Sequence, residues 1–371
     1  MIFAFTDEQR ELAATLRRFL QDKSGSAEVR RLMQTETGYD PQTWSQLAGQ
    51  LGLPGLIIPE KHGGSGAGPV ELALVCEEMG RALLCAPYFA TAVLAAQTLL
   101  ASGDQAAADE FLPGIADGST TATLALSEGD GAWAAEGVST RARRSGEGYV
   151  LDGRKSFVID GHTAGLLLVV ALADGGPSLF AVRGDAEGLG RRPLQTLDLT
   201  RKQAALSLDA TPGRLIGAEG SAGDVVTAAL RLAAVALAAE QVGGARRCLD
   251  MSVEYAKIRM QFGRPIGSFQ AIKHMCADML LEVESARSAA YYAAWAAQDG
   301  SDELPLLASL AKACCSEAYF RAAADNIQIH GGIGFTWEHD AHLYYRRAKS
   351  TELMLGTPAE HREIAAGYLI G

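Results

Sequence analysis

The sequence predicts an α+β fold in which a helical N-terminal domain at 1–118 precedes a small β domain at 119–215 and a helical C-terminal domain at 216–371. Three observations predict it. Apolar residues recur at helical spacing before residue 118, short apolar runs separated by turn residues follow, and a long Ala-rich stretch begins at residue 222. Helix, sheet and helix therefore succeed one another along the chain.

The first domain is predicted to contain only helices. Thr6 can cap the first helix because Gln9 follows at the spacing of a capping box, and Leu16 and Leu20 belong to its apolar face. Further helices are predicted at 39–51, 69–84, 91–101 and 106–115. The glycine-rich loop at 63–66 lacks the strand–Gly-x-Gly-x-x-Gly–helix context of a phosphate cradle, so an ordinary loop is favoured there.

The middle domain is predicted to consist of short strands with turn residues between them. The segments with strand composition are 123–127, 138–142, 149–151, 156–158, 166–171, 178–182 and 204–208. Strands that short, following one another without helices, predict a small β domain.

The C-terminal domain begins with two long helical patterns, at 228–257 and 271–297, which are separated by glycines and a proline. The turn between them presents a cation, two amides and two rings: Arg259, Gln261, Phe262, Phe269 and Gln270. Arginine binds phosphate as a planar fork, amides pair with polar ring edges, and aromatic rings flank flat groups. A simple helical hairpin with a salt-bridged arginine is the alternative interpretation of the same residues.

Composition restricts the function classes. The net charge of −11 argues against nucleic acid and against an anionic membrane surface as partners. The apolar stretches at 166–173 and 230–239 are too short to span a bilayer, and the first residues lack the pattern of a signal peptide. The six cysteines form no ligand-spaced cluster and are typical of reduced thiols. A cytoplasmic protein without a membrane span is therefore expected.

Two motifs in the C-terminal domain resemble signatures of the acyl-CoA dehydrogenase family. The first is Arg259-x-Gln261-Phe262-Gly263-x-x-Ile266-x-x-Phe269-Gln270, and the second is Gln328-Ile329-His330-Gly331-Gly332-Ile333-Gly334-Phe335-Thr336-x-Glu338. In that family the two blocks meet across a subunit interface around the adenine-diphosphate half of FAD. The resemblance implies a β-barrel or sandwich as middle domain, a C-terminal four-helix bundle, FAD, an acyl-CoA substrate, an electron-transfer flavoprotein or similar acceptor, and a homotetramer or heterotetramer.

The middle domain carries the flavin-ring part of the resemblance. The segment from Leu124 to Glu128 is similar to another family signature, although the residues from Glu128 to Ala132 replace the usual Pro-Gly-x-Gly-Ser loop. Phe157 and Ile159 stand where the family often has Trp and Thr, and Ile159 lacks a hydroxyl. Ordinary sheet residues are the alternative. The implied FAD contacts are Ser127, Phe157, Ile159, Arg259, Gln261, Phe262, Phe269, Gln270, Gln328, His330, Gly331, Gly332, Gly356 and Thr357.

The base that the family's reaction requires has no obvious counterpart. The family usually keeps a Glu before a Gly-Thr pair near the C-terminus, and here Leu355 precedes Gly356 and Thr357. Some members place the Glu on an earlier helix beside an Arg, and these positions hold Ala233 and Ala234.

Three other residues are candidates for the missing roles. Arg231, one turn from Ala234, is the candidate for the substrate-binding Arg. Glu240 is the candidate catalytic base, and the alternative is a structural partner for Arg246, Arg247 or Arg259. Glu352 is a further candidate base.

Three functions stay open on this resemblance. The chain is an active FAD-dependent acyl-CoA dehydrogenase with a displaced base, a non-catalytic subunit that completes the FAD site of a partner, or a flavin monooxygenase or oxidase of the same fold. The segment 336–340 looks similar to the actinobacterial branch that includes steroid side-chain acyl-CoA dehydrogenase subunits. A polar cluster of His330, Glu338, His339, Asp340 and His342 contains the His-x-x-His spacing of some metal sites, but no third ligand is evident, so no metal is expected.

Overall fold

The computed structural model describes residues 4–146 and 148–370. The chain forms two compact units. The helical unit comprises Met1–Arg30, Pro69–Leu84 and Ala234–Gly371, and the sheet unit comprises Arg31–Gly68 and Cys85–Ala233. Both units are assembled from segments that alternate along the chain. The domain boundaries predicted at 118 and 215 stay predictions.

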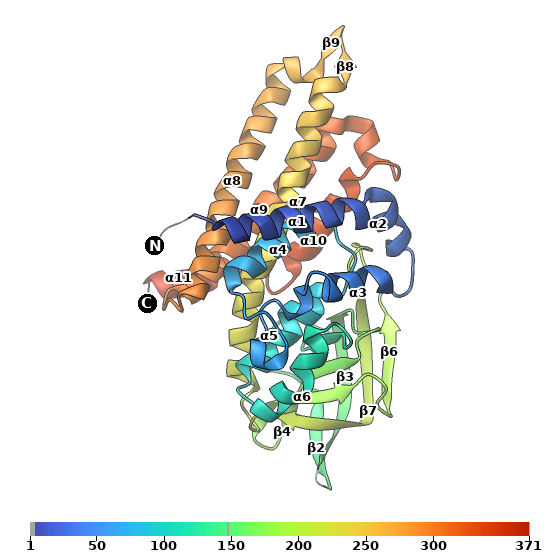
Figure 1. Cartoon of the computed structure of the whole chain (residues 1–371), viewed down its shortest axis with the longest axis vertical. Helices are drawn as coiled ribbons and strands as arrows, with labels where there is room; N and C mark the ends of the chain where they lie inside the picture. The colour runs from blue at the N-terminus through green and yellow to red at the C-terminus, as the bar shows by residue number, and fades with distance from the viewer. Residues whose placement is uncertain (1–3, 147, 371) are drawn as a thin grey trace. The chain divides into compact units, whose positions relative to one another are not determined.

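The predicted α+β class is confirmed, with helices at both ends of the chain and strands between them (Figure 1). The early helices are α1 (Asp7–Lys23), α2 (Ser26–Met33), α3 (Pro41–Gly49), η1 (Leu53–Gly55), η2 (Glu60–His62), α4 (Pro69–Arg81), the π-helical η3 (Phe89–Ala95), α5 (Ala96–Ala101) and α6 (Gln105–Ala116). The predicted capping box of α1 is present. The Gln9 amide donates to Thr6 Oγ1 at 3.2 Å, and the Thr6 amide donates to Gln9 Oε1 at 3.0 Å.

The glycine-rich loop at 63–66 is a structural turn. Its amides donate to carbonyls of the preceding segment: Ser65 to Gly55 at 3.0 Å, and Gly66 to Ile58 at 2.9 Å. A side chain on Gly64 would lie 2.0 Å from the Ile58 oxygen, so only glycine fits there. Because these amides already have acceptors within the chain, the loop is no phosphate cradle.

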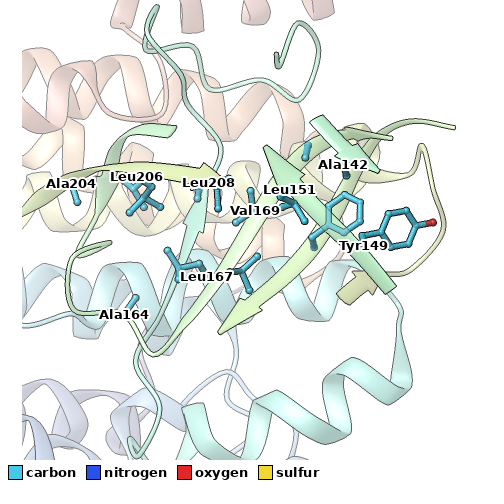
Figure 2. Close-up of a cluster of buried hydrophobic side chains, with 14 of the residues drawn as sticks. Ala142, Tyr149, Leu151, Ala164, Leu167, Val169, Ala204, Leu206 and Leu208 are labelled. Carbon is cyan, nitrogen blue, oxygen red and sulfur yellow. The ribbon is translucent and has the colours of Figure 1, made fainter. Parts of the chain in front are cut away.

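The sheet of the sheet unit closes on itself. Its strands are β1 (Ala122–Ala125), β2 (Arg141–Ser145), β3 (Gly148–Ile159), β4 (Leu166–Ala173), β5 (Gly176–Arg183), β6 (Leu189–Pro193) and β7 (Gln203–Ile216). They pair in the order β1-β4-β2-β3-β7-β5, with a further pairing of β4 with β5 and with β6 beside β7. The strands thus form a small barrel. The Leu and Val side chains of β3, β4 and β7 fill it (Figure 2).

Two of the strand predictions need correction. The strand expected at 138–142 begins at Arg141 instead, and the two strands expected at 149–151 and 156–158 form the single strand β3. β3 pairs with β7 throughout, but its register shifts between Leu151 and Gly153 and again between Lys155 and Val158. These irregularities interrupt the alternation of inward and outward side chains, which is why the pattern indicates two strands.

The C-terminal helices lie mostly in the helical unit. They are α7 (Ala222–Ile258), which starts in the sheet unit, and α8 (Gln270–Gln298), α9 (Leu304–His330), α10 (Ala341–Leu353) and α11 (Pro358–Ile370), with the short turns η4 (Ile266–Ser268) and η5 (Gly331–Phe335). Between α7 and α8 the predicted turn is present as a hairpin of β8 (Met260–Gln261) and β9 (Arg264–Pro265), which forms the tip of the two long helices (Figure 1). Buried polar contacts join α7 to α9, among them Gln241 Nε2 to Ser316 Oγ at 3.0 Å.

Helix α7 is longer than the apolar stretch predicted at 230–239. By length and composition alone its 37 residues include a window apolar enough to cross a bilayer, with a hydropathy of 1.6. However, 61% of that window is buried inside the protein, as is common for a core helix. The expected absence of a membrane span stays a prediction.

Helices α4 and α7 cross with almost no side chain between them. A side chain on Gly243 would lie 1.8 Å from the Glu77 oxygen, and one on Gly80 would lie 2.0 Å from the Glu240 oxygen. Each glycine therefore faces the backbone of the other helix. Small residues at such a crossing let the two backbones approach closely.

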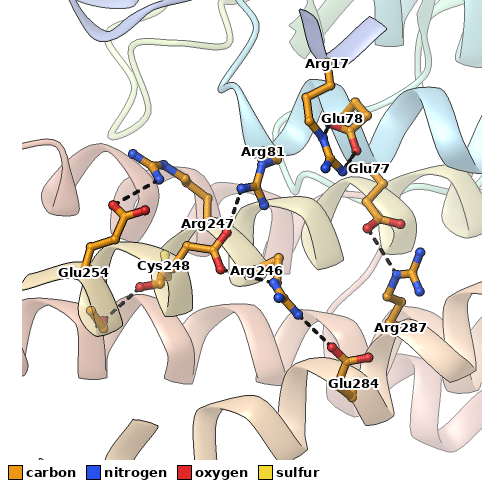
Figure 3. A network of polar contacts seen from close by, with 12 residues as sticks. Arg17, Glu77, Glu78, Arg81, Arg246, Arg247, Cys248, Glu254, Glu284 and Arg287 are labelled. Atoms are coloured by element: carbon orange, nitrogen blue, oxygen red, sulfur yellow. Dashed lines mark hydrogen bonds and ion pairs between the residues drawn. The ribbon is translucent and has the colours of Figure 1, made fainter. Parts of the chain in front are cut away.

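Ion pairs surround this crossing (Figure 3). Glu77 of α4 accepts from Arg287 of α8 at 3.2 Å, and Arg81 of α4 pairs with Asp250 of α7 at 2.7 Å. Asp250 also pairs with Arg246 at 3.2 Å. The network thus fixes the relative positions of α4, α7 and α8 within the helical unit.

Candidate functional site

The hairpin β8–β9 presents the first motif to solvent. Arg259 directly follows α7, and its backbone oxygen accepts from the Ile266 amide at 2.8 Å, which closes the turn. The Arg259 side chain is exposed, and within the described residues no carboxylate lies at ion-pair distance from it. Phe262 is 90% exposed and lies 6.0 Å from the Phe269 ring, edge to face. An exposed arginine fork beside exposed amides and rings fits a phosphate-bearing ligand with flat groups.

The second motif ends α9 close to the first. His330 is buried and stacks on Tyr255 with ring centroids 4.3 Å apart, and Tyr255 lies one helical turn before Arg259. His330 Nδ1 lies 2.8 Å from the Asn326 oxygen, and burial lowers the pKa of this imidazole. The structure therefore brings the ends of the two motifs together within one chain.

Gly331 and Gly332 leave room beside these residues. A side chain on either glycine would meet no atom within 4 Å, and Gly331 has a left-handed backbone with φ of 62°. Gln328 is exposed one turn earlier on α9. The donor set and the open space at both glycines fit the adenine-diphosphate part of FAD.

The predicted flavin contacts of the sheet unit surround the bulge in β3. Phe157 has φ of 58° and is 42% exposed, so its ring is available to a flat ligand. Ser127 Oγ donates to the Ala132 oxygen at 2.7 Å and so fixes the loop that follows β1. Ile159 is only 1% exposed. Its backbone oxygen accepts from Thr123 Oγ1 at 2.6 Å, so the structure gives no support to the predicted contact of Ile159 with the cofactor.

A buried ion pair beside Ser127 was not foreseen. Lys155 Nζ donates to Glu128 Oε1 at 2.8 Å, and the amides of Ser139 and Thr140 donate to the same carboxylate at 2.9 and 3.0 Å. Burial, the largest single effect, raises the pKa of Glu128, but these hydrogen bonds outweigh it and hold the pKa well below its usual range. The loop that replaces the family's Pro-Gly-x-Gly-Ser is thus fastened by its first residue.

Neither position of the family's base offers a carboxylate. Leu355 is buried and has φ of 62°, and its oxygen accepts from His361 Nε2 at 3.0 Å. Thr357 already donates through its amide and hydroxyl to Glu360 Oε2, at 2.7 and 2.9 Å, and caps α11. Ala233 is completely buried on α7.

Glu240 is held in a buried ion pair. It is 5% exposed, and its Oε1 accepts from Arg347 Nη1 at 3.1 Å. The structural partners expected for it from the sequence are wrong, since Arg246 pairs with Asp250 and Glu284, and Arg247 with Glu254. Protonating Glu240 would remove the negative charge that the buried Arg347 pairs with, so the carboxylate is a poor proton acceptor. This geometry argues for the structural role of Glu240 and against the catalytic one.

The remaining candidates differ in their surroundings. Glu352 Oε2 pairs with Lys349 at 2.9 Å on the half-buried surface of α10. Arg231 is half-buried on α7, and within the described residues no carboxylate pairs with it. In the same described part of the chain no group of three potential metal ligands occurs, so the segment at 338–342 forms no such cluster.

Lys312 is a second buried cation that was not foreseen. It is 0% exposed on α9, and its Nζ donates to Ser316 Oγ at 2.9 Å and to the backbone oxygens of Glu352 and Gly356, both at 3.1 Å. Burial lowers the pKa of Lys312 to about 8. Lys312 lies on the buried face of α9 together with Ala308, Ala311 and Cys315. A lysine at helical spacing among apolar residues is the signal that could have identified it from the sequence.

Comparisons with known proteins agree with this geometry. Models of the acyl-CoA dehydrogenase N-terminal, middle and C-terminal domains match residues 6–119, 123–209 and 222–369. Acyl-CoA dehydrogenase IpdE2 of Mycobacterium tuberculosis is 36% identical over 95% of this chain and 95% of its own length. The chain is also similar to the solved structure of a variant of the steroid ACAD Tcur3481–Tcur3483, with 34% identity, 98% of each chain covered and a TM-score of 0.88. The ChsE4–ChsE5 complex from Mycobacterium tuberculosis matches with 29% identity, 100% and 99% coverage and a TM-score of 0.89.

Proposed function

This chain belongs to the acyl-CoA dehydrogenase family, FAD-dependent oxidoreductases that act on CH–CH groups, and we propose that it serves as the base-lacking subunit of a mixed assembly. In that assembly a second acyl-CoA dehydrogenase subunit supplies the carboxylate for α,β-dehydrogenation of an acyl-CoA thioester. The observation that carries the proposal is the pair of apolar residues, Leu355 and Ala233, at both positions of the family's base. The buried pairing of Glu240 with Arg347 removes the nearest substitute.

The residues of this chain would bind and orient rather than abstract the proton. Arg259, Gln261 and Gln270 would hold the diphosphate and adenine side of FAD, and Phe157 would flank its ring. Bound FAD would supply the hydride acceptor for the reaction at the β-carbon. Removal of the weakly acidic α-proton needs a positioned base, and no described carboxylate at the family's positions can provide one. Arg231 stays a proposed substrate contact.

Two solved structures support a partner of the same family. One is described as Tcur3481–Tcur3483 and the other as the complex of ChsE4 with ChsE5, so both descriptions name two polypeptides. The first is called a steroid ACAD, and a steroid-derived acyl group is the substrate class that this likeness favours. An electron-transfer flavoprotein or similar acceptor and a cytoplasmic location complete the proposal.

The second candidate function is an active dehydrogenase that works alone with Glu240 as base. It differs from the first in one measurable respect, because a lone subunit would then turn over its substrate at a rate typical of an enzyme with a placed carboxylate. General base catalysis contributes about 10²–10⁴-fold, so the two candidates differ by that factor in turnover.

The deciding experiment restores the missing carboxylate. The purified, FAD-loaded chain is expected to oxidise acyl-CoA very slowly, and Leu355→Glu is expected to raise its turnover, by up to about 10²–10⁴-fold. Leu355→Gln has the same size without a base and is the matched control. Glu240→Gln is expected to leave turnover per bound flavin unchanged. Rapid turnover by the double variant Glu240→Gln, Glu352→Gln without a partner would overturn the proposal.

A further inference from the structure

Lys312 is a buried lysine on α9 whose ammonium group is bound by neutral oxygens. Within the described residues no carboxylate lies at ion-pair distance from its Nζ, and the acceptors are the Ser316 hydroxyl and the backbone oxygens of Glu352 and Gly356. The Glu352 carboxylate pairs with Lys349 instead. Ser316 is itself fixed by Gln241 of α7 at 3.0 Å. Burying a cation without a carboxylate costs stability unless its hydrogen bonds offset that cost.

The two backbone oxygens mark the ends of one short loop. Glu352 lies in the last turn of α10, and Gly356 precedes α11, so a single ammonium joins both sides of the segment 352–356. Inside this segment Leu355 and Gly356 have φ of 62° and 104°, which is the left-handed region. A leucine adopts this conformation only when its surroundings impose it. Lys312 and His361, which donates to the Leu355 oxygen, supply that constraint.

This loop is also the one that holds the residues of interest in the proposed function. Leu355 stands at the position of the family's base, and Gly356 and Thr357 are proposed FAD contacts. The Thr357 amide and hydroxyl donate to Glu360 of α11 and therefore fix the C-terminal end of the loop. The rest of its shape depends on the donors that bind the backbone oxygens of the loop. The only side-chain donor that reaches both Glu352 and Gly356 oxygens in the described chain is Lys312.

We propose that Lys312 is a positioning residue, whose ammonium shapes the loop 352–357 and so sets the conformation of residue 355 and of the Gly356–Thr357 pair, the proposed FAD contacts of this loop. The inference rests on the proposed function for the role of this loop. It adds a residue on α9, 40 or more positions away in sequence, as the support on which cofactor affinity and the placement of residue 355 depend.

The direct test replaces the ammonium by a side chain of similar length without a donor. In Lys312→Met the oxygens of Glu352 and Gly356 lose their donor while buried, so the loop is expected to rearrange. Hydrogen exchange of the amides at 353–357, followed by mass spectrometry, is expected to accelerate about tenfold or more. FAD affinity, measured by quenching of flavin fluorescence, is expected to fall by a similar factor, with a shifted visible spectrum of the bound flavin. Lys349→Met is the matched control, since Lys349 contacts the Glu352 carboxylate but not the loop backbone.

The free energy of unfolding, measured as a function of pH, shows whether the Lys312→Met variant folds and whether burial lowers the pKa of Lys312 in the wild type. The unfolded lysine has a pKa near 10.5 and the folded one about 8, so the unfolded chain binds more protons between these values. The free energy of unfolding of the wild type is therefore expected to rise relative to that of Lys312→Met between pH 8 and 10. The other ionisable groups near Lys312 do not titrate between pH 8 and 10 in a way that imitates this change. Burial raises the pKa of Cys315 and lowers that of His361. Hydrogen bonds from Thr357 lower the pKa of Glu360, and Glu352 is paired with Lys349.

Three outcomes decide the proposal. Faster exchange at 353–357 together with weaker FAD binding in Lys312→Met, and neither change in Lys349→Met, supports it. Unchanged exchange overturns it. Faster exchange with unchanged FAD affinity and spectrum also overturns it, because Lys312 is then structural only, and this result leaves the proposed function intact. An error in the proposed flavin site would show in a different experiment, because FAD would then bind Arg259→Ala as tightly as the wild type.

Discussion

Leu355 combines an apolar side chain with a backbone conformation that leucine disfavours. Its φ of 62° costs roughly 1–2 kcal/mol relative to a right-handed or extended residue. Glutamate and leucine are both unbranched at Cβ, so replacing one by the other at this φ changes the side chain and not the backbone strain. The comparison of Leu355→Glu with Leu355→Gln therefore reports on the carboxylate itself.

Arg259 is the residue on which cofactor affinity should depend most. Its guanidinium is exposed and has no ion-pair partner among the described residues, so it is free to form a charge-assisted bond to phosphate. Arg259→Ala should weaken FAD binding by roughly 1.5–3 kcal/mol, which is about 10- to 150-fold in Kd. Titration of the apoprotein with FAD, followed by fluorescence, measures this change.

The matched control for this prediction lies on the same hairpin. The Arg264 guanidinium sits 4.1 Å from the centroid of the Phe269 ring. Arg264→Ala removes the same charge but a cation–π contact instead of the proposed phosphate contact, so its effect on FAD affinity should be smaller. Equal losses in the two variants would mean that general positive charge, and not a specific contact of Arg259, binds the cofactor.

At the residue scale, the sequence indicates which residues are unusual but not what surrounds them. An acid in an Ala-rich helix is visible in the sequence, and Glu240 is such a case. Its partner Arg347 lies 107 positions away on α10, and no local spacing could have selected it over the nearer Arg246 and Arg247. Long-range pairing of buried charges is set by how helices cross, which periodicity does not encode.

The crossing of α4 and α7 makes a prediction at the scale of elements. In Gly243→Ala the new methyl group would meet the Glu77 backbone oxygen at 1.8 Å, and neither backbone can move without disturbing the ion pairs beside it. Overpacking of this kind costs about 1–3 kcal/mol or more in the free energy of unfolding. Urea denaturation measures this loss in the free energy of unfolding. The turn at β8–β9 is expected to keep its conformation.

Gly367 provides the control for helix propensity. It lies inside α11, where a side chain would meet nothing within 4 Å. Gly367→Ala should therefore stabilise the protein by about 0.5–1 kcal/mol, because alanine is the better helix former. If Gly243→Ala were also stabilising, the close approach of α4 and α7 would be wrong.

Elements with a regular period were predictable, and irregular ones were not. The heavily apolar helices and the strands β4 and β5 lie close to their predicted positions. Helix α2 was missed because its eight residues are too few to show a helical period, although Val29, Leu32 and Met33 are buried. Strand β6 was missed because an edge strand of Leu-Gly-Arg-Arg-Pro has no alternation. Segment 91–101 was predicted as one helix, but its first part is π-helical, a change of hydrogen bonding that side-chain periodicity does not reveal.

The whole molecule is predicted to work as an assembly of four chains, of one kind or two. Large apolar side chains are exposed on several helical elements, including Leu281 on α8, which is 69% exposed, and Tyr368 and Leu369 on α11. Contiguous apolar surface marks interfaces between chains, and we expect these side chains to be covered in the assembly. Light scattering of the flavin-loaded assembly should give the mass of four chains, which is four times 39.1 kDa if all four are alike. A stable flavin-loaded monomer would contradict the prediction.

Because segments of the two units alternate along the chain, the helical unit cannot finish folding early during synthesis on the ribosome. Helices α1 and α4 belong to the helical unit and contact each other through Arg17 and Glu78, but the long helices of that unit follow residue 222, so about two-thirds of the chain must be synthesised before the unit can be completed. Until then their apolar faces stay exposed to other nascent chains. The glycine crossing and its ion pairs consequently form late, and folding in the cell should depend on chaperones that cover the early helices. A cut at any single position would divide the helical unit, whereas the sheet unit stays whole when the cut falls before residue 31 or after residue 233.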